Sequence, residues 1–162
     1  MMNKPAIGLL LFLTGVLFTA CQPRPVLNEK RTFPDRQWTN ADTLDFEVAI
    51  QDTTQLYDLF LDVTHSPDFP NQNCYIKIYT RFPDGQRLGK LVSLELADKS
   101  GVWFGRCNKR SCRLAVPLQT RAYFNKPGDY LFTIEQYTRM DTLPGIQSLG
   151  MRIVPSPEPS EK

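Results

Sequence analysis

The sequence predicts an all-β protein, built as a two-sheet antiparallel sandwich of about seven to eight strands. Apolar and polar residues alternate at period two over several short runs, which is typical of strands with one buried face. Glycine and proline turn signals separate these runs, and after the first twenty residues no run has the spacing of an amphipathic helix. An immunoglobulin-like and a jelly-roll-like topology suit this pattern equally well.

The expected strands follow one another along a single domain, residues 38–154. Two runs, 44–50 and 57–65, alternate most regularly, and 74–81 is apolar on both faces, as a central strand would be. Pro117 restricts its run to an edge or to a strand end, because proline cannot donate a ladder hydrogen bond. The predicted strands cover residues 44–50, 57–65, 74–81, 92–96, 102–104, 114–118, 130–135 and 149–153.

Residues 1–20 have the organisation of a lipoprotein signal peptide. Lys4 gives a positive start, and an uncharged, largely apolar run of fifteen residues leads to Thr19-Ala20. A retained transmembrane helix is the weaker interpretation, since a span needs about 20 residues. Phe18-Thr19-Ala20-Cys21 resembles a bacterial lipobox. We therefore expect Cys21 to become an acylated N-terminus that anchors the protein in membrane lipid.

Polar segments flank the predicted domain on both sides. Residues 21–37 contain three prolines and no apolar period, which indicates a lipidated tether that would hold the domain off the bilayer. Residues 155–162 are rich in proline, serine and glutamate, and we expect a disordered tail.

The charge balance argues against a nucleic-acid partner. The chain has a formal net charge of +2, and its acidic and basic residues are interleaved between Asp42 and Arg152. Such interleaving gives no basic stripe that could neutralise a phosphate backbone.

The sequence predicts no enzyme, no cofactor and no metal site. It has one histidine, His65, at the end of an expected strand, where a hydrogen bond to a loop is a commoner role than general base catalysis. Neither a Gly-x-Ser-x-Gly motif nor a glycine-rich phosphate loop is present. His65, Cys74, Cys107 and Cys112 could supply four zinc ligands, but their spacing does not match a zinc motif and structural roles are favoured.

The cysteines after Cys21 predict one disulfide bond. Cys107 and Cys112 are separated by four residues between two expected strands, so a hairpin tip can bring them together in an oxidising compartment. The basic residues between them form either a solvated tip or a binding epitope. Cys74 is interpreted as a buried, reduced side chain.

The segment 134–146 is the candidate interaction site. It leaves a strand and places several polar side chains on a connection, where packing does not require them. Glu135, Arg139 and Asp141 could brace the loop through ion pairs, or the loop could contact a partner. The hypothesis is a partner-binding surface made of Gln136, Tyr137, Arg139 and Asp141.

A long set of residues supports a family resemblance. Its most specific part is Ile-Glu-Gln-x-x-Arg-x-Asp-x-Leu-Pro-Gly-Ile, which begins at Ile134. The other matching positions are Trp38, Asp42-Thr43-Leu44, Ile50, Tyr57-Asp58-Leu59, Val63-Thr64-His65, Pro70, Pro83-Asp84-Gly85, Leu96-Ala97-Asp98, Trp103, Gly105 and Gly128-Asp129-Tyr130. In this order and spacing, from Trp38 to Ile153, the chain resembles the gliding-motility lipoproteins called GldH. Tyr137 and the 107–112 loop depart from the family pattern.

The resemblance implies an outer-membrane lipoprotein of the gliding-motility and associated secretion machinery, with no assigned enzymatic activity. It would act through contacts with other envelope proteins. The alternative is an envelope lipoprotein that binds a saccharide or a peptide, and absence of a deep polar cleft would favour the first role. No acidic residue follows Cys21 before Glu29, whereas surface-exported lipoproteins of this group carry an acidic cluster there. We therefore expect a periplasm-facing domain.

Overall fold

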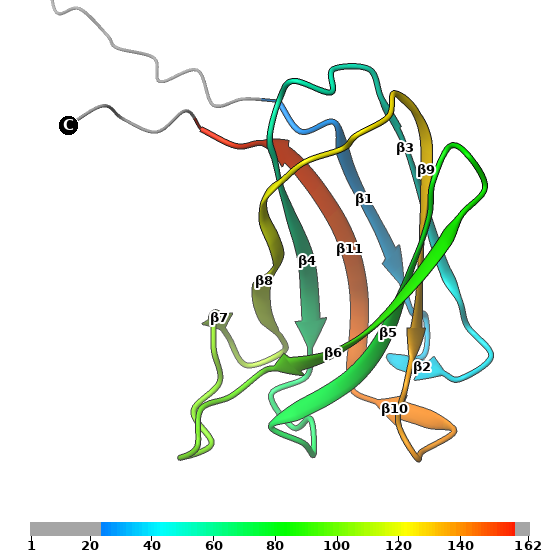
Figure 1. The fold of residues 1–162 in the computed structure, drawn as a ribbon. Helices are drawn as coiled ribbons and strands as arrows, with labels where there is room; N and C mark the ends of the chain where they lie inside the picture. Colours follow the sequence, from blue (N-terminus) through cyan, green and yellow to red (C-terminus); the bar gives the residue numbers. More distant parts are fainter. Residues whose placement is uncertain (1–23, 158–162) are drawn as a thin grey trace, which may run out of the picture.

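The computed structural model describes residues 24–157, which form a two-layer β-sandwich (Figure 1). Within this range the chain contains strands and no helix, which confirms the predicted all-β class. Cys21, the signal peptide and residues 158–162 lie outside the described residues. The strands are β1 Leu27–Thr32, β2 Gln37–Thr39, β3 Leu44–Ile50, β4 Tyr57–His65, β5 Asn73–Arg81, β6 Arg87–Glu95, β7 Arg106–Cys107, β8 Cys112–Ala122, β9 Gly128–Gln136, β10 Thr142–Pro144 and β11 Ile146–Pro155.

The strands form two sheets and a short ribbon. One sheet has five strands in the order β1-β11-β4-β8-β7, and the other has four in the order β3-β9-β5-β6. β10 and β2 form the ribbon, which lies at the end of the sandwich opposite the start of β1 and the end of β11 (Figure 1). All strand pairs are antiparallel, as the sequence predicts.

The core lies between the two sheets, because alternate residues of the facing strands point inward. β3 and β4 show this most regularly: every second side chain is buried. Pro117 lies on β8, where β7 covers only the first residues of the strand, so one side of the strand is an uncovered edge at Pro117, as the sequence predicts. The largest fully buried side chains include Trp38, Phe46, Leu61, Ile76, Tyr130 and Ile134.

The structure corrects both predicted domain boundaries. Residues expected in the tether form β1, which pairs with β11 from Leu27↔Ile153 to Thr32↔Ser148. The fold begins at Val26, whose N–H donates to the Ile153 carbonyl at 2.8 Å. β1 has no period-two signal because it is an edge strand that buries only its first side chain. At the other end, β11 continues to Pro155, which the sequence assigned to the tail.

The strand expected at 102–104 is absent from the described fold. Only one bridge forms there, between Ala97 and Trp103, and Val102 is exposed. The Asp98 carboxylate accepts hydrogen bonds from the N–H groups of Ser100 and Val102 at 2.8 and 2.9 Å. These bonds close a turn, which is why apolar residues here do not extend as a strand.

Candidate functional site

The loop between β9 and β10, residues 137–141, contains most of the predicted interaction site. It lies at the same end of the sandwich as β2 and β10, opposite the start of β1 (Figure 1). This placement follows from register, because β11 starts beside the end of β1, at Thr32↔Ser148, and ends beside its start. The loop therefore lies at the opposite end of the sandwich from the point where the chain enters the fold.

Gln136 is buried and holds this loop in shape. Only 7% of its surface is exposed, and its Nε2 donates to the carbonyls of Met140 and Asp141 at 3.2 and 3.1 Å. The Thr138 hydroxyl donates to Gln136 Oε1 at 2.6 Å. Satisfying a buried amide in this way stabilises the loop. Gln136 is therefore a structural residue, and its assignment to the exposed contact surface is wrong.

Asp141 ties the loop to the turn between β2 and β3. The Asn40 backbone N–H donates to the Asp141 carbonyl at 2.8 Å, and Asn40 Nδ2 donates to Asp141 Oδ1 at 3.1 Å. Among the described residues, no ion pair joins Glu135, Arg139 and Asp141. Amide hydrogen bonds brace the loop, and the ion-pair interpretation is wrong.

The exposed side chains of the loop border an apolar groove. Tyr137 and Met140 are 57% and 44% exposed, and the Tyr137 N–H donates to the Tyr75 carbonyl at 2.8 Å. The groove has a volume of about 780 Å³ and is lined by Tyr75, Leu91, Tyr137, Arg139 and Met140, among others. Aromatic and arginine side chains on a rigid support are the residue types enriched at protein-binding hot spots.

The Leu143-Pro144-Gly145-Ile146 string is structural. Leu143 and Ile146 are each 1% exposed, and Gly145 has φ +93°, a left-handed conformation that favours glycine. Its N–H donates to the Arg36 carbonyl and its carbonyl accepts from the Ser66 N–H, both at 2.7 Å. This part of the sequence therefore specifies how β10 meets β11.

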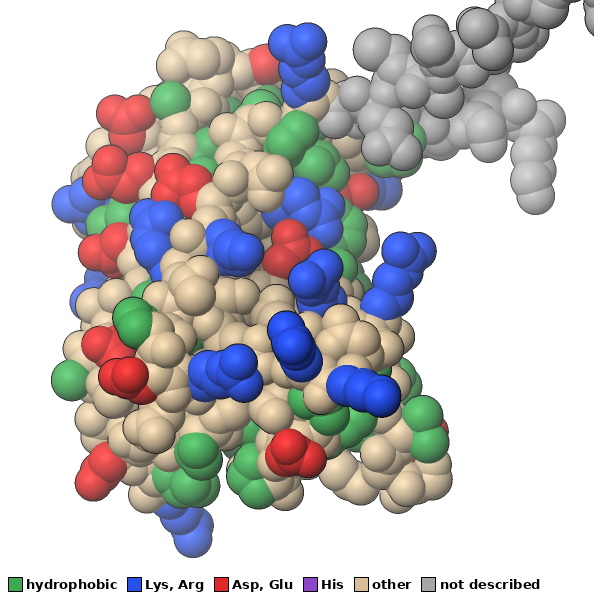
Figure 2. Space-filling model, turned by 180° about the vertical axis from the view of Figure 1, so that it is seen from behind, with side chains coloured by type: hydrophobic (Ala, Val, Ile, Leu, Met, Phe, Trp, Pro, Cys, Tyr) green, Lys and Arg blue, Asp and Glu red, His purple; other side chains and the backbone are tan. Residues whose placement is uncertain are grey.

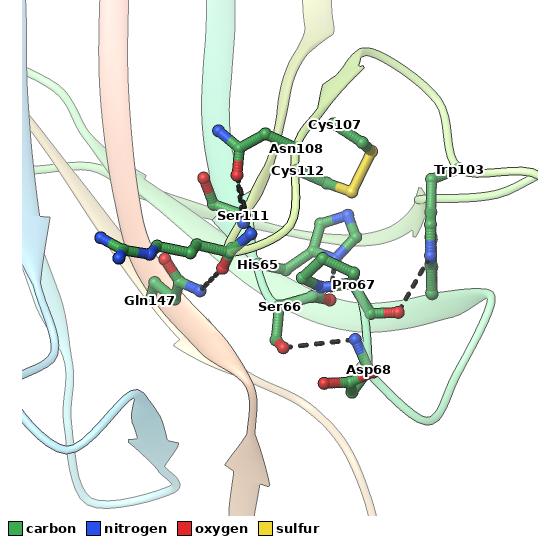
Figure 3. The surroundings of a disulfide bond; sticks show 11 residues. His65, Ser66, Pro67, Asp68, Trp103, Cys107, Asn108, Ser111, Cys112 and Gln147 are labelled. Atoms are coloured by element: carbon green, nitrogen blue, oxygen red, sulfur yellow. Dashed lines mark hydrogen bonds between the residues drawn. A yellow bond between two sulfur atoms is a disulfide. The ribbon is translucent and has the colours of Figure 1, made fainter.

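The predicted disulfide joins β7 and β8 (Figure 3). The Cα atoms of Cys107 and Cys112 are 4.0 Å apart. Asn108 Oδ1 accepts from the N–H groups of Arg110 and Ser111 at 2.8 and 2.9 Å. Gln147 Nε2 donates to the Arg110 carbonyl at 2.9 Å, which fixes the tip to β11.

Cys74 is free and buried, as predicted. Burial raises the pKa of its thiol to about 12, so the reactive thiolate form is suppressed at neutral pH. This places Cys74 among the structural cysteines.

His65 ends β4 beside the disulfide and is fully buried (Figure 3). Its Nδ1 lies 2.8 Å from the Ser66 carbonyl oxygen, and its ring packs edge-on against Trp103 with centroids 4.7 Å apart. Burial lowers the pKa of the imidazole, which favours the neutral form. Within residues 24–157, no three His, Cys, Asp or Glu side chains are grouped as metal ligands would be.

Basic side chains gather on the side of the molecule that Figure 2 shows. Lys30, Arg106 and Arg113 line a groove of about 800 Å³ over the five-stranded sheet. Asp62, also in its lining, accepts two hydrogen bonds from Arg152, both at 3.0 Å. This groove could not be predicted from the sequence, because its residues come from strands far apart in the chain.

The sequence family described as GldH lipoprotein matches residues 25–153. The chain belongs to the GldH lipoprotein family. It is 24% identical to the gliding motility lipoprotein GldH homolog of Christiangramia forsetii, over 93% of this chain and 96% of that protein. It is 21% identical to the gliding motility lipoprotein GldH of Flavobacterium johnsoniae, over 89% of this chain and 93% of that protein.

A more distant likeness is to the structure of an arabinose-bound α-L-arabinofuranosidase. It has 11% identity and a TM-score of 0.37, and covers 83% of this chain but only 23% of the arabinofuranosidase. A TM-score this low supports no conclusion. Across the described residues of the GldH-family chain, no helix is long and apolar enough to cross a membrane.

Proposed function

We propose that this GldH-family lipoprotein is a non-catalytic component of the gliding-motility and secretion machinery, anchored in the outer membrane through acylated Cys21. Its sandwich faces the periplasm and contacts other envelope proteins through Tyr137, Arg139 and Met140, three of the exposed residues of the 137–141 loop. The observation that supports this most is the groove beside that loop, at the end of the sandwich opposite the start of β1. The relatives named for gliding motility support the cellular role.

Chain geometry supports presentation of the loop away from the bilayer. The fold begins at Val26, whose N–H is hydrogen-bonded to β11. Val26 lies five positions after Cys21 in the sequence, and five residues of extended chain span at most about 18 Å. The six residues of β1 then run about 20 Å away from that entry point. The start of β1 is thereby held near the membrane, and the loop lies at the far end.

The groove indicates the chemistry of the partner. Its lining is mostly apolar, with the Arg139 guanidinium beside it, and the Lys77 ammonium lies 5.8 Å from the centre of the Tyr137 ring. A protein segment with apolar side chains and a carboxylate would match these groups.

The loop surface is tested by replacing Tyr137 and Arg139 with alanine in the full-length lipoprotein. Exposed side chains contribute little to folding, so the melting temperature should stay close to wild type. Loss of a hot spot costs about 2 kcal/mol or more, so recovery of envelope partners should fall by about 30-fold. Tyr123→Ala is the matched control, because Tyr123 is 64% exposed and follows β8, near the start of β9.

Two outcomes would contradict this role. Wild-type recovery of partners by the double variant would remove the loop from the interface. Binding of a soluble saccharide or free peptide at Tyr75 and Tyr137, with partner recovery unchanged, would instead establish the ligand-binding alternative.

Anchoring is tested separately with Cys21→Ala. The variant should take up no labelled fatty acid and should leave the membrane fraction, whereas wild type is labelled. Protease added to intact cells should leave the wild-type domain uncut. Labelling of the variant would overturn the anchor, and cleavage in intact cells would overturn the periplasmic orientation.

A further inference from the structure

β6 and β8 leave one side of the sandwich without a covering strand. Within residues 24–157, β6 pairs only with β5, and β7 pairs with β8 only at Arg113 and Cys112. Beyond Arg113, β8 pairs only with β4. Each strand therefore presents a row of backbone N–H and C=O groups that another strand could pair with.

A narrow apolar cavity opens between these two strands. It has a volume of about 130 Å³ and reaches into the core. A cavity of about 150 Å³ lined by similar side chains holds a benzene molecule in another protein, so this one has room for a single aromatic or branched side chain. Its apolar lining comprises Leu59, Ile78, Leu88, Val92, Leu118, Phe132 and Met151.

Lys90 adds a positive charge to the lining. It stands opposite Ile78 in the β5–β6 register, and Leu88 and Val92 share its face of β6 because side chains alternate along a strand. No ion pair in the described part of the chain includes Lys90. A carboxylate near an inserted apolar side chain would complement this charge.

We propose that β6 accepts an extended strand from a partner protein by β-sheet addition, with one apolar side chain in the cavity and an acidic residue two positions away facing Lys90. Backbone pairing along β6 would supply affinity, and the cavity and Lys90 would supply specificity. Leu88 is 62% exposed and would be covered by the added strand.

This surface is separate from the 137–141 loop surface. The anchoring side chains of the added strand would contact the inward-facing side chains of β6, including Leu88 and Val92, whereas Leu91, which lines the loop groove, points to the outer face. Tyr137→Ala should therefore leave binding at the β6 edge unchanged.

Synthetic nine-residue peptides test the proposal on the mature lipoprotein in nanodiscs. The main probe alternates valine and threonine, with a central phenylalanine and a glutamate two residues later. Backbone amides of Arg87–Glu95 should exchange hydrogen more slowly when this peptide is added, and those of Leu44–Ile50, in β3, should not. The same peptide with lysine for glutamate should bind about three- to fivefold more weakly. A peptide with a central proline should not bind.

Charge reversal tests the role of Lys90. Lys90→Glu should reverse the preference between the glutamate and lysine peptides, and Lys90→Gln should remove it. Lys90→Gln tests the same contact if Lys90→Glu folds poorly. Lys99→Glu makes the same charge change in the turn after β6 and should leave the preference unchanged.

Four outcomes would overturn the proposal. The first two are that no peptide slows hydrogen exchange in β6, or that the proline peptide slows it as much as the main probe does. The third is that laurate displaces the peptides, and the fourth is that exchange slows with protein concentration alone. Laurate competition would identify the cavity as a lipid site, and concentration dependence would identify the partner as a second copy of this chain.

Discussion

The two side edges of the sandwich differ in how they are closed. At one edge β1 lies beside β3: the Arg31 guanidinium donates to the Asp45 carbonyl at 2.9 Å and lies 5.0 Å from the centre of the Phe46 ring. At the other edge, β6 and β8 are separated by a cavity that reaches the core residues Phe132 and Met151. Within residues 24–157 both edges end in unpaired edge strands, but a side chain bridges the two sheets at the first edge and a cavity separates them at the second, the open edge.

The difference shows that a polar edge strand can close the gap between two sheets with a side chain. β1 buries only Leu27, and the side chain of Arg31 bridges the gap from β1 to β3. The open edge has more apolar surface and less cover, since Leu114, Val116 and Leu118 are only partly buried. An apolar edge without a covering strand is typical of an interaction surface.

The largest expected effect separates the two edges by stability. Phe46 is fully buried behind β1, and Phe46→Ala should lower the free energy of unfolding by about 3–5 kcal/mol, because it leaves a cavity in the core. Leu88→Ala at the open edge should change it by less than about 0.5 kcal/mol. Urea unfolding of both variants measures this. Comparable losses would show that the two edges are equally packed.

Gly150 tests whether β1 is a fixed part of the fold. It pairs with Lys30 on β1, and an added Cβ would lie 2.9 Å from the Glu29 carbonyl oxygen. Gly150→Val should therefore displace β1, cost about 1–3 kcal/mol and accelerate hydrogen exchange over 27–32. Gly89→Ala in β6 is the control, since its Cβ would meet only the side chains of Tyr79 and Lys77, which can move. An unchanged exchange rate in β1 would mean that it is loosely attached.

The sequence predicts strands well where burial alternates and poorly where it does not. β3 and β4 each bury one face, so apolar residues recur at every second position of their sequences. β1 has no such pattern, because it is a polar edge strand held by backbone hydrogen bonds, and its sequence resembles that of a linker. Gln136 did carry a usable signal: it falls in phase with the buried Phe132 and Ile134 on β9.

The grooves and the open edge could not be predicted from the sequence. Each depends on the order of strands in the sheets, which local patterns do not specify. Leu88 and Leu118, for example, face the same cavity from strands that never pair. The disulfide could be predicted because its cysteines are only five positions apart in the chain.

The disulfide holds β7 against β8, and in the described fold β7 is the only strand that covers part of the β8 edge. Closing so short a loop should stabilise the protein by about 2 kcal/mol. Reduction should lower the urea midpoint accordingly and accelerate exchange of the β8 amides near Arg113, which pairs with Arg106 on β7. Cys74→Ala should show the same shift on reduction. If reductant had no effect on wild type, the bond would not support this end of the edge.

The smallest expected effect is a pH dependence at the same end of the β8 edge, where His65 pairs with Cys112. Burial lowers the pKa of His65 below its ordinary value of 6.5. Just below pH 6.5, His65 is therefore protonated to a greater extent in the unfolded chain than in the folded chain. Stability is therefore full above pH 6.5 and falls as the pH drops below it, by at most about 1.4 kcal/mol per unit.

Urea midpoints between pH 7.5 and 5 measure this, and the chain has no other histidine to titrate in that range. The packed rings of Trp103 and Phe69 surround the imidazole, so a protonated ring would lose favourable solvation at this position. His65→Gln should lower stability at all pH values but remove the dependence. A flat wild-type profile would mean that the imidazole gains a compensating contact when it is charged.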